Sequence, residues 1–166
     1  MKNKIILILA LVTANLLSPS ALAQEIEWLK LNEAQQLNNK TKTEKWTIID
    51  MYTPWCGPCR MMEKSTFTDS SVIVLMDHFH AVKFNAEGPD DVTYNGKVYS
   101  NPNYDVTKGN GRNYAHQLTS HFRITGYPTL ILLDREGEIV ERIVGYQTPE
   151  RMIDILERII KTQSEQ

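Results

Sequence analysis

Runs of apolar residues with little polar interruption mark the strands of this chain, because a strand that is buried on both faces has no polar side. The clearest run covers residues 46–52 and reads WTIIDMY. A Glu136-Gly137 pair separates the last two runs and predicts a turn between antiparallel partners. The predicted strands are residues 25–31, 46–52, 81–85, 129–134 and 138–144.

Apolar residues spaced three or four positions apart predict helices between the strands. Asn32, Asp69 and Thr148 stand where helix-capping residues are preferred, and Pro149 follows at a first helical position. The predicted helices run from Asn32 through Leu37, from Cys59 onward, from Asp69 along Val72, Leu75, Met76 and Phe79, over 118–122, and from Thr148 along Met152, Ile155, Leu156 and Ile159. The order βαβαβ and then ββα predicts an α/β fold with a central mixed sheet flanked by helices.

One segment, about residues 87–115, breaks this regular pattern and is called the insert below. It is rich in Gly, Asn, Asp and Tyr, and residues 92–99 predict a small hairpin on an Asn95-Gly96 turn. A segment this long inside a compact domain is either functional or loosely ordered. Its tyrosines could form a docking surface or a local cluster that holds the segment together; they are Tyr94, Tyr99, Tyr104 and Tyr114.

The first 23 residues have the layout of a secretory signal peptide. Lys2 and Lys4 precede an apolar stretch over 5–17, and Ala21-Leu22-Ala23 offers small residues for cleavage. The apolar stretch is short for a transmembrane helix, so membrane attachment is expected only if the signal stays uncleaved. The sequence therefore predicts a signal peptide over 1–23, one domain over 24–166, and a periplasmic or secreted location.

Charge excludes one class of partner. The 166-residue chain has 18 basic and 20 acidic residues and a net charge of −2, and loss of Lys2 and Lys4 with the signal would leave −4. The charges of both signs are scattered, so no basic footprint for nucleic acid is present. The sequence predicts no nucleic-acid partner.

The two cysteines, Cys56 and Cys59, are the only ones in the chain. A disulfide across two residues closes almost no chain and stabilises a fold little, so a chemical role is favoured over a structural one. Such a pair is a two-electron switch if one sulfur is exposed and acidic. A zinc site would need two more ligands, and no pair among the four histidines has finger spacing. We expect no metal and no cofactor.

Over residues 25–162 the chain resembles the thioredoxin superfamily. The motifs are Trp55-Cys56-Gly57-Pro58-Cys59 after a strand, Asp50 six positions before Cys56, Lys83 on the next strand, Gly126-Tyr127-Pro128-Thr129, and Gly145. The resemblance implies a thioredoxin fold with the insert placed before a cis-proline segment. Lys64 stands where thioredoxins usually have a helix-kinking proline, which implies a straighter active-site helix, and Tyr52 stands where they usually have tryptophan.

The resemblance and the position of the cysteines give the site residues their expected roles. Cys56 at a helix N-terminus would be the nucleophile, because the helix dipole stabilises a thiolate, and Cys59 would be the resolving thiol in a Cys56–Cys59 disulfide. Asp50 would relay a proton to Cys59, or else be an ordinary strand-end aspartate. Lys83 would modulate Asp50, or else be a solvated strand-edge lysine.

The remaining expected site residues bind substrate or tune the redox potential. Pro128 alone would be expected trans, and only the resemblance makes it cis. The Tyr127 backbone would then pair with an extended substrate, while Trp55 would be either a contact surface or simple packing. The Gly57-Pro58 dipeptide is that of thioredoxins and would favour a reducing potential.

These expectations define an exported thiol–disulfide oxidoreductase that reduces protein disulfides. Its partners would be protein disulfide substrates and, because a reductase cannot stay reduced in an oxidising space, a membrane thiol transporter as electron donor. Two alternatives remain: a disulfide oxidase or isomerase on the same fold, and a non-catalytic binding module whose thiols are incidental.

Overall fold

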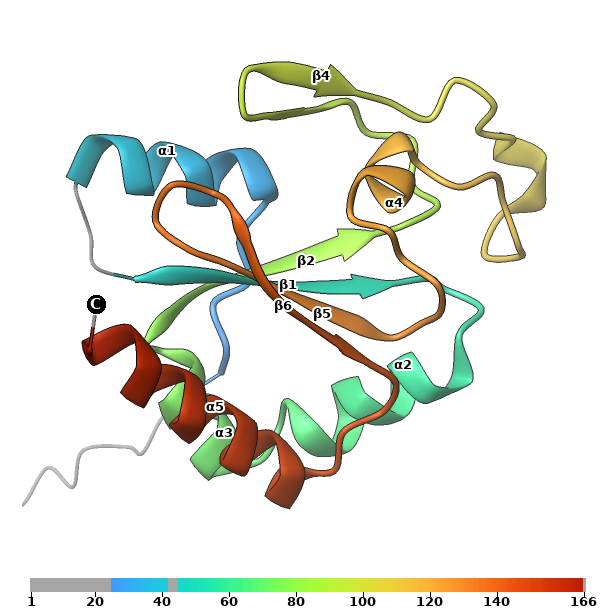
Figure 1. The fold of residues 1–166 in the computed structure, drawn as a ribbon. Coiled ribbons are helices and arrows are strands. Elements are labelled where there is room, and N and C mark those ends of the chain that lie inside the picture. The colour runs from blue at the N-terminus through green and yellow to red at the C-terminus, as the bar shows by residue number, and fades with distance from the viewer. Residues whose placement is uncertain (1–24, 42–44, 166) are drawn as a thin grey trace, which may run out of the picture.

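A four-stranded mixed sheet lies at the centre of the computed structural model, which describes residues 25–41 and 45–165 (Figure 1). The strand order is β2-β1-β5-β6. Strand β1 runs parallel to β2 and antiparallel to β5, and β5 runs antiparallel to β6. The strands are β1 (Trp46–Tyr52), β2 (Phe79–Asn85), β5 (Thr129–Leu133) and β6 (Ile139–Val144). The predicted α/β class with a mixed sheet is confirmed. The predicted signal peptide lies outside the described residues.

Helices cover both faces of the sheet, and α1 and α4 lie on one face while α2, α3 and α5 lie on the other (Figure 1). The helices are α1 (Leu31–Thr41), α2 (Gly57–Met61), α3 (Ser70–Met76), α4 (Gln117–His121) and α5 (Pro149–Ser164). Alternation along β1 sends Ile49 and Met51 into the core with α1 and α4, and Trp46 and Ile48 into the core with α3 and α5. Asp50 has the same parity as Trp46 and Ile48, so it faces the side of the active-site helix.

The insert contains the predicted hairpin, formed by β3 (Val92–Tyr94) and β4 (Lys97–Tyr99). Its turn residues Asn95 and Gly96 have φ of 47° and 75°, the left-handed pair that a two-residue hairpin turn of this kind requires. Tyr94 and Tyr99 are buried against Phe122 and the α1 side of the sheet. These two tyrosines therefore hold the hairpin to the core, whereas Tyr114 is 52% exposed.

The predicted first strand, residues 25–31, is wrong. A single parallel bridge joins Leu29 to Val82, and α1 already begins at Leu31. The apolar residues Ile26 and Trp28 pack against the core on the α3 and α5 side, which accounts for their apolar character without a strand. Asn32 does not cap the helix: the Glu33 carboxylate accepts from the Lys30 backbone N–H at 2.8 Å instead.

The predicted helix through Phe79 also ends too late. Helix α3 stops at Met76, and Phe79 is the first residue of β2, paired with Trp46. Val72, Met76 and Phe79 line the same core cluster. Helical spacing therefore could not show that the chain changes from helix to strand between them.

The active-site helix is not the straight helix that the resemblance implied. After five residues, α2 passes into a π-helical turn over Met62–Thr66, where the Phe67 N–H donates to the Met62 carbonyl five residues earlier. The Thr66 hydroxyl donates to the Gln147 carbonyl at 2.7 Å, which fastens this turn to the segment before α5. The irregular turn thus occurs without a proline.

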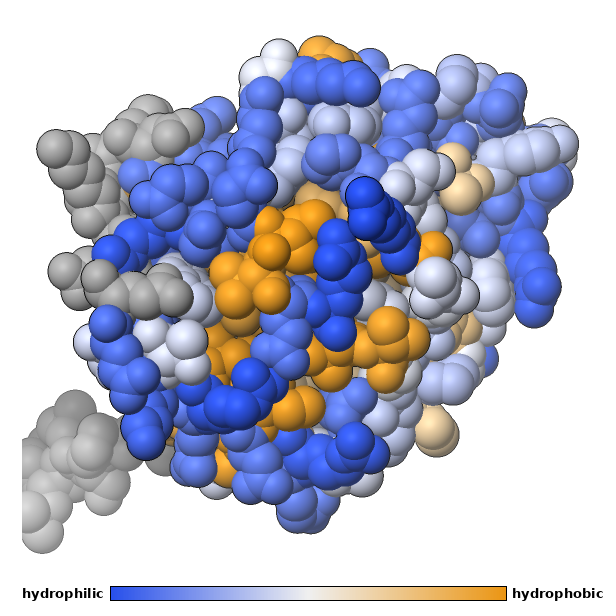
Figure 2. Space-filling model, viewed as in Figure 1, coloured by the Kyte–Doolittle hydropathy of each residue, from blue (hydrophilic) through white to orange (hydrophobic). Residues whose placement is uncertain are grey.

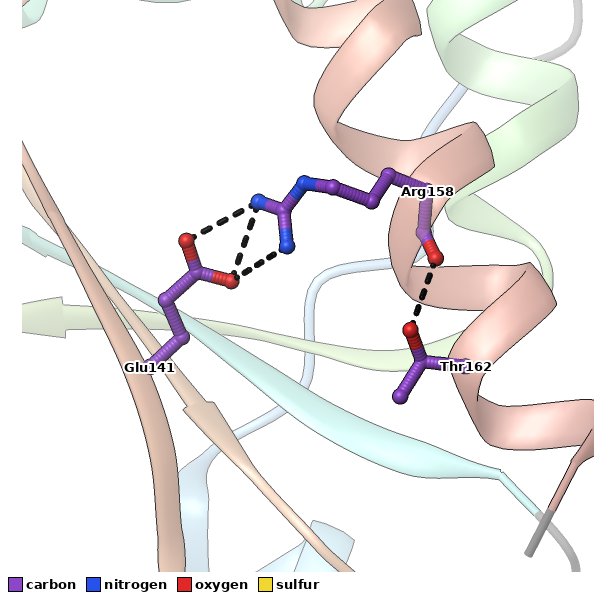
Figure 3. A network of polar contacts seen from close by, with 3 residues as sticks. All are labelled: Glu141, Arg158 and Thr162. Carbon is purple, nitrogen blue, oxygen red and sulfur yellow. Dashed lines mark hydrogen bonds and ion pairs between the residues drawn. The ribbon is translucent and has the colours of Figure 1, made fainter.

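Strand β6 forms one edge of the sheet and is tied to α5 by a bidentate ion pair between Glu141 and Arg158 (Figure 3). Figure 2, seen from the same side as Figure 1, shows apolar surface near the middle of the view, crossed by hydrophilic side chains. The exposed valines of β6 are Val140 and Val144. Charged side chains on an edge strand discourage pairing with another chain.

Across 25–41 and 45–165, no helix has the length and apolar character that crossing a bilayer requires.

Candidate active site

The two cysteines lie where β1 gives way to α2, joined by a disulfide with a Cα–Cα distance of 5.3 Å. Cys56 is the N-cap of α2, and its sulfur accepts a hydrogen bond from the Cys59 backbone N–H at 3.1 Å. This places the Cys56 sulfur among the unpaired N–H groups of the helix start, as the sequence predicts. In this oxidised state Cys56 is only 3% exposed and Cys59 is 7% exposed, so Cys56 does not have the exposure that a freely accessible nucleophile needs.

Asp50 is a buried carboxyl and not a solvated strand-end residue, because only 4% of it is exposed. Within the described residues its Oδ1 atom has no hydrogen-bond partner. Burial raises the pKa of Asp50 to about 7, opposed by the nearby Lys83 charge and assisted by the Glu63 charge. A carboxyl with a pKa near 7 can both take up and release a proton at neutral pH.

A cavity of about 160 Å³ connects Asp50 to Cys59. Its lining includes Asp50, Thr53, Cys59, Glu63 and Lys83. A water molecule occupies about 30 Å³ in the liquid, so the cavity is large enough for several waters and is polar enough to hold them. Proton exchange between the Asp50 carboxyl and the Cys59 sulfur can therefore run through water.

Lys83 lies on β2 directly across from Asp50 in the parallel register. Its ammonium forms an ion pair with Glu63, and it lies 5.2 Å from the centre of the Tyr52 ring. The side chain is only 20% exposed, so it is not a solvated edge lysine. Sequence reasoning missed Glu63. The signal was available, since Glu63 is four residues after Cys59 and falls on the same helix face.

The Tyr127–Pro128 peptide bond is cis, as the resemblance implies. The Gly145 N–H donates to the Pro128 carbonyl at 2.8 Å, and Gly145 has a φ of 92°, a conformation that favours glycine. The Tyr127 ring lies edge-on to the Trp55 ring with centroids 6.0 Å apart. The structure thus brings together the predicted substrate-binding residues from two distant parts of the chain.

Two further residues at this surface, Glu87 and Arg112, were missed by sequence reasoning, and both come from the insert. Glu87 is 8% exposed, and its Oε2 accepts from the Trp55 indole N–H at 2.8 Å and from the Asn113 backbone N–H at 2.7 Å. The Arg112 guanidinium lies 4.3 Å from the centre of the Trp55 ring. Glu87 could have been suspected, because it follows β2 by two residues and ligand-binding groups gather at the carboxyl ends of parallel strands.

Residues 33–160 match the family model of the thioredoxin-like domain. The chain belongs to the thioredoxin-like domain family. The family and the Cys56–Cys59 disulfide support thiol–disulfide oxidoreductase chemistry, in agreement with the enzyme class predicted from the sequence.

Two known proteins each match about two thirds of this chain. The thiol:disulfide interchange protein DsbD of Tatumella citrea is 27% identical over 117 residues, which are 69% of this chain and 16% of that protein. Thioredoxin H2 of Arabidopsis thaliana is 27% identical over 113 residues, which are 68% of this chain and 62% of that protein. The chain therefore spans less than two thirds of the length of each of these relatives.

A solved structure gives the fold. The solution structure of a putative disulphide-isomerase from Bacteroides thetaiotaomicron shares 27% identity and a TM-score of 0.54, and the match covers 87% of this chain and 98% of that one. The thioredoxin fold predicted from the sequence is confirmed.

Proposed function

We propose that this chain is an exported reductase of protein disulfides. The observation that carries the proposal is the Cys56–Cys59 pair at the start of α2, with the buried Asp50 carboxyl opening into the same cavity as Cys59. In the reduced protein, the Cys56 thiolate attacks one sulfur of a substrate disulfide. A Cys56–substrate mixed disulfide forms, and the other substrate sulfur leaves as a thiolate.

Cys59 completes the cycle. Its thiol loses a proton to the Asp50 carboxylate through water in the shared cavity, and the resulting thiolate attacks the Cys56 sulfur. The second substrate thiolate leaves, so the substrate gains two electrons and the protein keeps the Cys56–Cys59 disulfide. A base with a pKa of about 7 suits this step, because it is available near neutral pH and can return the proton when the protein is reduced again.

The reducing direction rests on sequence. Gly57-Pro58 between the cysteines and a buried Asp50 are the combination that thioredoxins carry, and thioredoxin has a reduction potential of about −270 mV. Export rests on the signal-like residues 1–23. Together they require an electron donor outside the cytosol, for which we propose a membrane thiol transporter, and the resemblance to an interchange protein supports that class of partner.

A second candidate is a disulfide isomerase, which the name of the Bacteroides relative suggests. An isomerase leaves its substrate's total number of disulfides unchanged, whereas a reductase lowers it. The two functions therefore differ in the redox state that the protein itself keeps.

Reduction of insulin in the presence of dithiothreitol tests the proposal. We expect the wild-type protein to accelerate precipitation of the insulin B chain and Cys56→Ser to be inactive. No acceleration by the wild type would contradict the proposal and favour a binding module with incidental thiols. Acceleration together with faster refolding of a scrambled disulfide protein in an oxidising glutathione buffer would favour the isomerase.

A further inference from the structure

The insert places a cation on the tryptophan that precedes the nucleophilic cysteine. The Arg112 guanidinium lies 4.3 Å from the centre of the Trp55 ring, and Trp55 is bonded directly to Cys56 along the chain. In Figure 1 this part of the insert, drawn in yellow, lies at the same end of the sheet as the loop between β1 and α2. The insert thus contributes to the surface that a substrate disulfide must approach.

Glu87 holds the backbone next to Arg112. The Glu87 Oε2 atom accepts from the Trp55 indole N–H and from the backbone N–H of Asn113, the residue after Arg112. Asn113 is held in turn, because its side chain donates to the Asp105 carbonyl at 2.8 Å and accepts from the Asp105 N–H at 3.0 Å. The beginning and the end of the insert are therefore joined at Trp55, and the backbone next to Arg112 is held in place before a substrate binds.

The charge of Arg112 is available to a partner. The residue is exposed, and among residues 25–41 and 45–165 no carboxylate forms an ion pair with it. The Oε2 atom of Glu87 is already used by two N–H donors. A second exposed cation of the insert, Lys108, lies 4.3 Å from the centre of the Tyr114 ring.

We propose that Arg112 is a specificity-determining residue that selects substrates with an acidic residue next to the disulfide to be reduced. This inference rests on the proposed reductase function and names its substrate class. A substrate strand that lies against the Tyr127 backbone passes over the Trp55 ring, because the two rings are in edge-on contact. A carboxylate beside its cystine then meets the guanidinium, which binds carboxylates with two parallel hydrogen bonds.

Three peptides test the inference. They share one sequence with one intramolecular disulfide and differ only in the residues that flank it, which are aspartate, serine or lysine. The reduced full chain is mixed with each peptide under single-turnover conditions, and the second-order rate constant is measured at low and at high salt. The variants are Arg112→Glu, Arg112→Lys, and Arg151→Glu as a control with the same change of net charge on α5, on the other face of the sheet.

We expect the wild type to reduce the aspartate peptide about three- to fivefold faster than the serine peptide, the range of an exposed charge pair, and the lysine peptide more slowly than both. Arg112→Glu should reverse this order. Arg112→Lys should keep the order with a smaller ratio, and Arg151→Glu should behave like the wild type. High salt should compress all the ratios.

Two results would overturn the inference in distinguishable ways. If the serine peptide is reduced but the aspartate and lysine peptides react at the same rate, or Arg151→Glu changes the order as much as Arg112→Glu does, Arg112 does not select the substrate while the reductase function stands. If the wild type reduces none of the three peptides, the proposed function itself fails, and this inference fails with it.

Discussion

The two sides of the Cys56–Cys59 disulfide are built in different ways. The inner wall, formed by Asp50, Glu63 and Lys83, lies around the cavity next to Cys59. The outer rim, formed by Trp55, Glu87, Arg112 and Tyr127, lies where a substrate would approach. The inner wall comes from β1, β2 and the turn after α2, whereas the rim comes from loops and from the insert. Under the proposed function, this difference separates the groups that would move protons from the groups that would contact a partner.

The two sides also differ in how charge is accommodated. On the inner wall, Asp50 is buried, one of its oxygens has no hydrogen-bond partner in the part of the chain that the structure describes, and its pKa is raised to about 7. On the rim, the buried Glu87 carboxylate accepts two N–H donors. The first arrangement is unfavourable for the ionised form and suits proton exchange, while the second supplies the carboxylate with hydrogen bonds and orients the indole.

The largest expected effect separates the two cysteines. Cys59→Ser should lose turnover and accumulate a mixed disulfide with substrate, because Cys56 can attack but nothing resolves the product. Cys56→Ser should also lose turnover but should trap nothing. Non-reducing electrophoresis followed by mass spectrometry measures the trapped species. Trapping through Cys59 in the Cys56→Ser variant would mean that the two roles are exchanged.

The next effect belongs to the inner wall. Asp50→Asn should slow release of the substrate thiol from a preformed mixed disulfide by roughly hundredfold at pH 8, the lower end of the range for general acid–base catalysis. The wild-type rate should rise with pH through about 7, as Asp50 ionises and becomes able to accept the Cys59 proton. Rapid-quench measurement of thiol release across pH 5–9 tests this, with the exposed Asp154→Asn as control. An unchanged pH profile in Asp50→Asn would remove Asp50 from the resolving step.

Asp50→Asn should also raise the free energy of unfolding at pH 8, although it slows the reaction there. Because the folded pKa of Asp50 is about 7 and the unfolded value is 3.8, ionisation opposes folding. Stability from this group is complete below pH 3.8, falls as the pH rises to about 7, and then stays constant. Asp50→Asn should therefore be more stable than wild type at pH 8 by about 2 to 4 kcal/mol and no more stable at pH 4. Urea unfolding at the two pH values measures the difference, and loss of stability at pH 8 would contradict the buried, high-pKa assignment.

The sequence predicted the inner wall better than the rim. The apolar run of β1 located Asp50, and the cysteine spacing located the disulfide, because these features are local in the chain. Parallel pairing of β1 with β2 then brought Lys83 opposite Asp50. Glu63 was not predicted, although its spacing of four residues from Cys59 places it on the same helix face.

Two residues of the rim, Glu87 and Arg112, were not predicted because their positions depend on contacts between distant residues. Glu87 and Arg112 lie 32 and 57 positions after Trp55 in the numbering, inside a segment with no periodicity. The position of Glu87 two residues after β2 was the one local signal, and nothing local marks Arg112 as stacked on Trp55. The wrong strand at 25–31 and the late helix end at Phe79 have a related cause, since apolar spacing reports burial and not which element the residue belongs to.

A smaller effect is expected on the rim. Glu87→Gln keeps the size of the side chain but replaces two charge-assisted hydrogen bonds with weaker ones, so the indole and the insert are held less firmly. We expect kcat/KM for a protein disulfide to fall by about threefold to fivefold, while reduction of the Cys56–Cys59 disulfide by dithiothreitol stays within twofold. The exposed Glu157→Gln on α5 is the matched control. Equal losses in both reactions would place Glu87 with the inner wall, and the comparison of the two sides would fail.

The smallest expected effect concerns a hydrogen bond that attaches the hairpin of the insert to the sheet, away from the disulfide. Tyr94 donates its hydroxyl hydrogen to the Gly137 carbonyl in the turn between β5 and β6. Tyr94→Phe removes that bond and should lower the free energy of unfolding by about 1 kcal/mol, with insulin turnover within twofold of wild type. The exposed Tyr114→Phe should change stability by less than about 0.5 kcal/mol. A large loss of turnover in Tyr94→Phe would mean that the hairpin participates in the reaction.

The most direct test of the reductase assignment is the reduction potential of the Cys56–Cys59 pair. The protein without residues 1–23 is equilibrated with thiol buffers of known potential, and the redox state is followed by tryptophan fluorescence, since Trp55 is bonded to Cys56. A value near about −270 mV, that of thioredoxin, is the result expected from Gly57-Pro58 and Asp50. A value between about −120 and −180 mV, the range of oxidases and isomerases, would contradict the proposed direction.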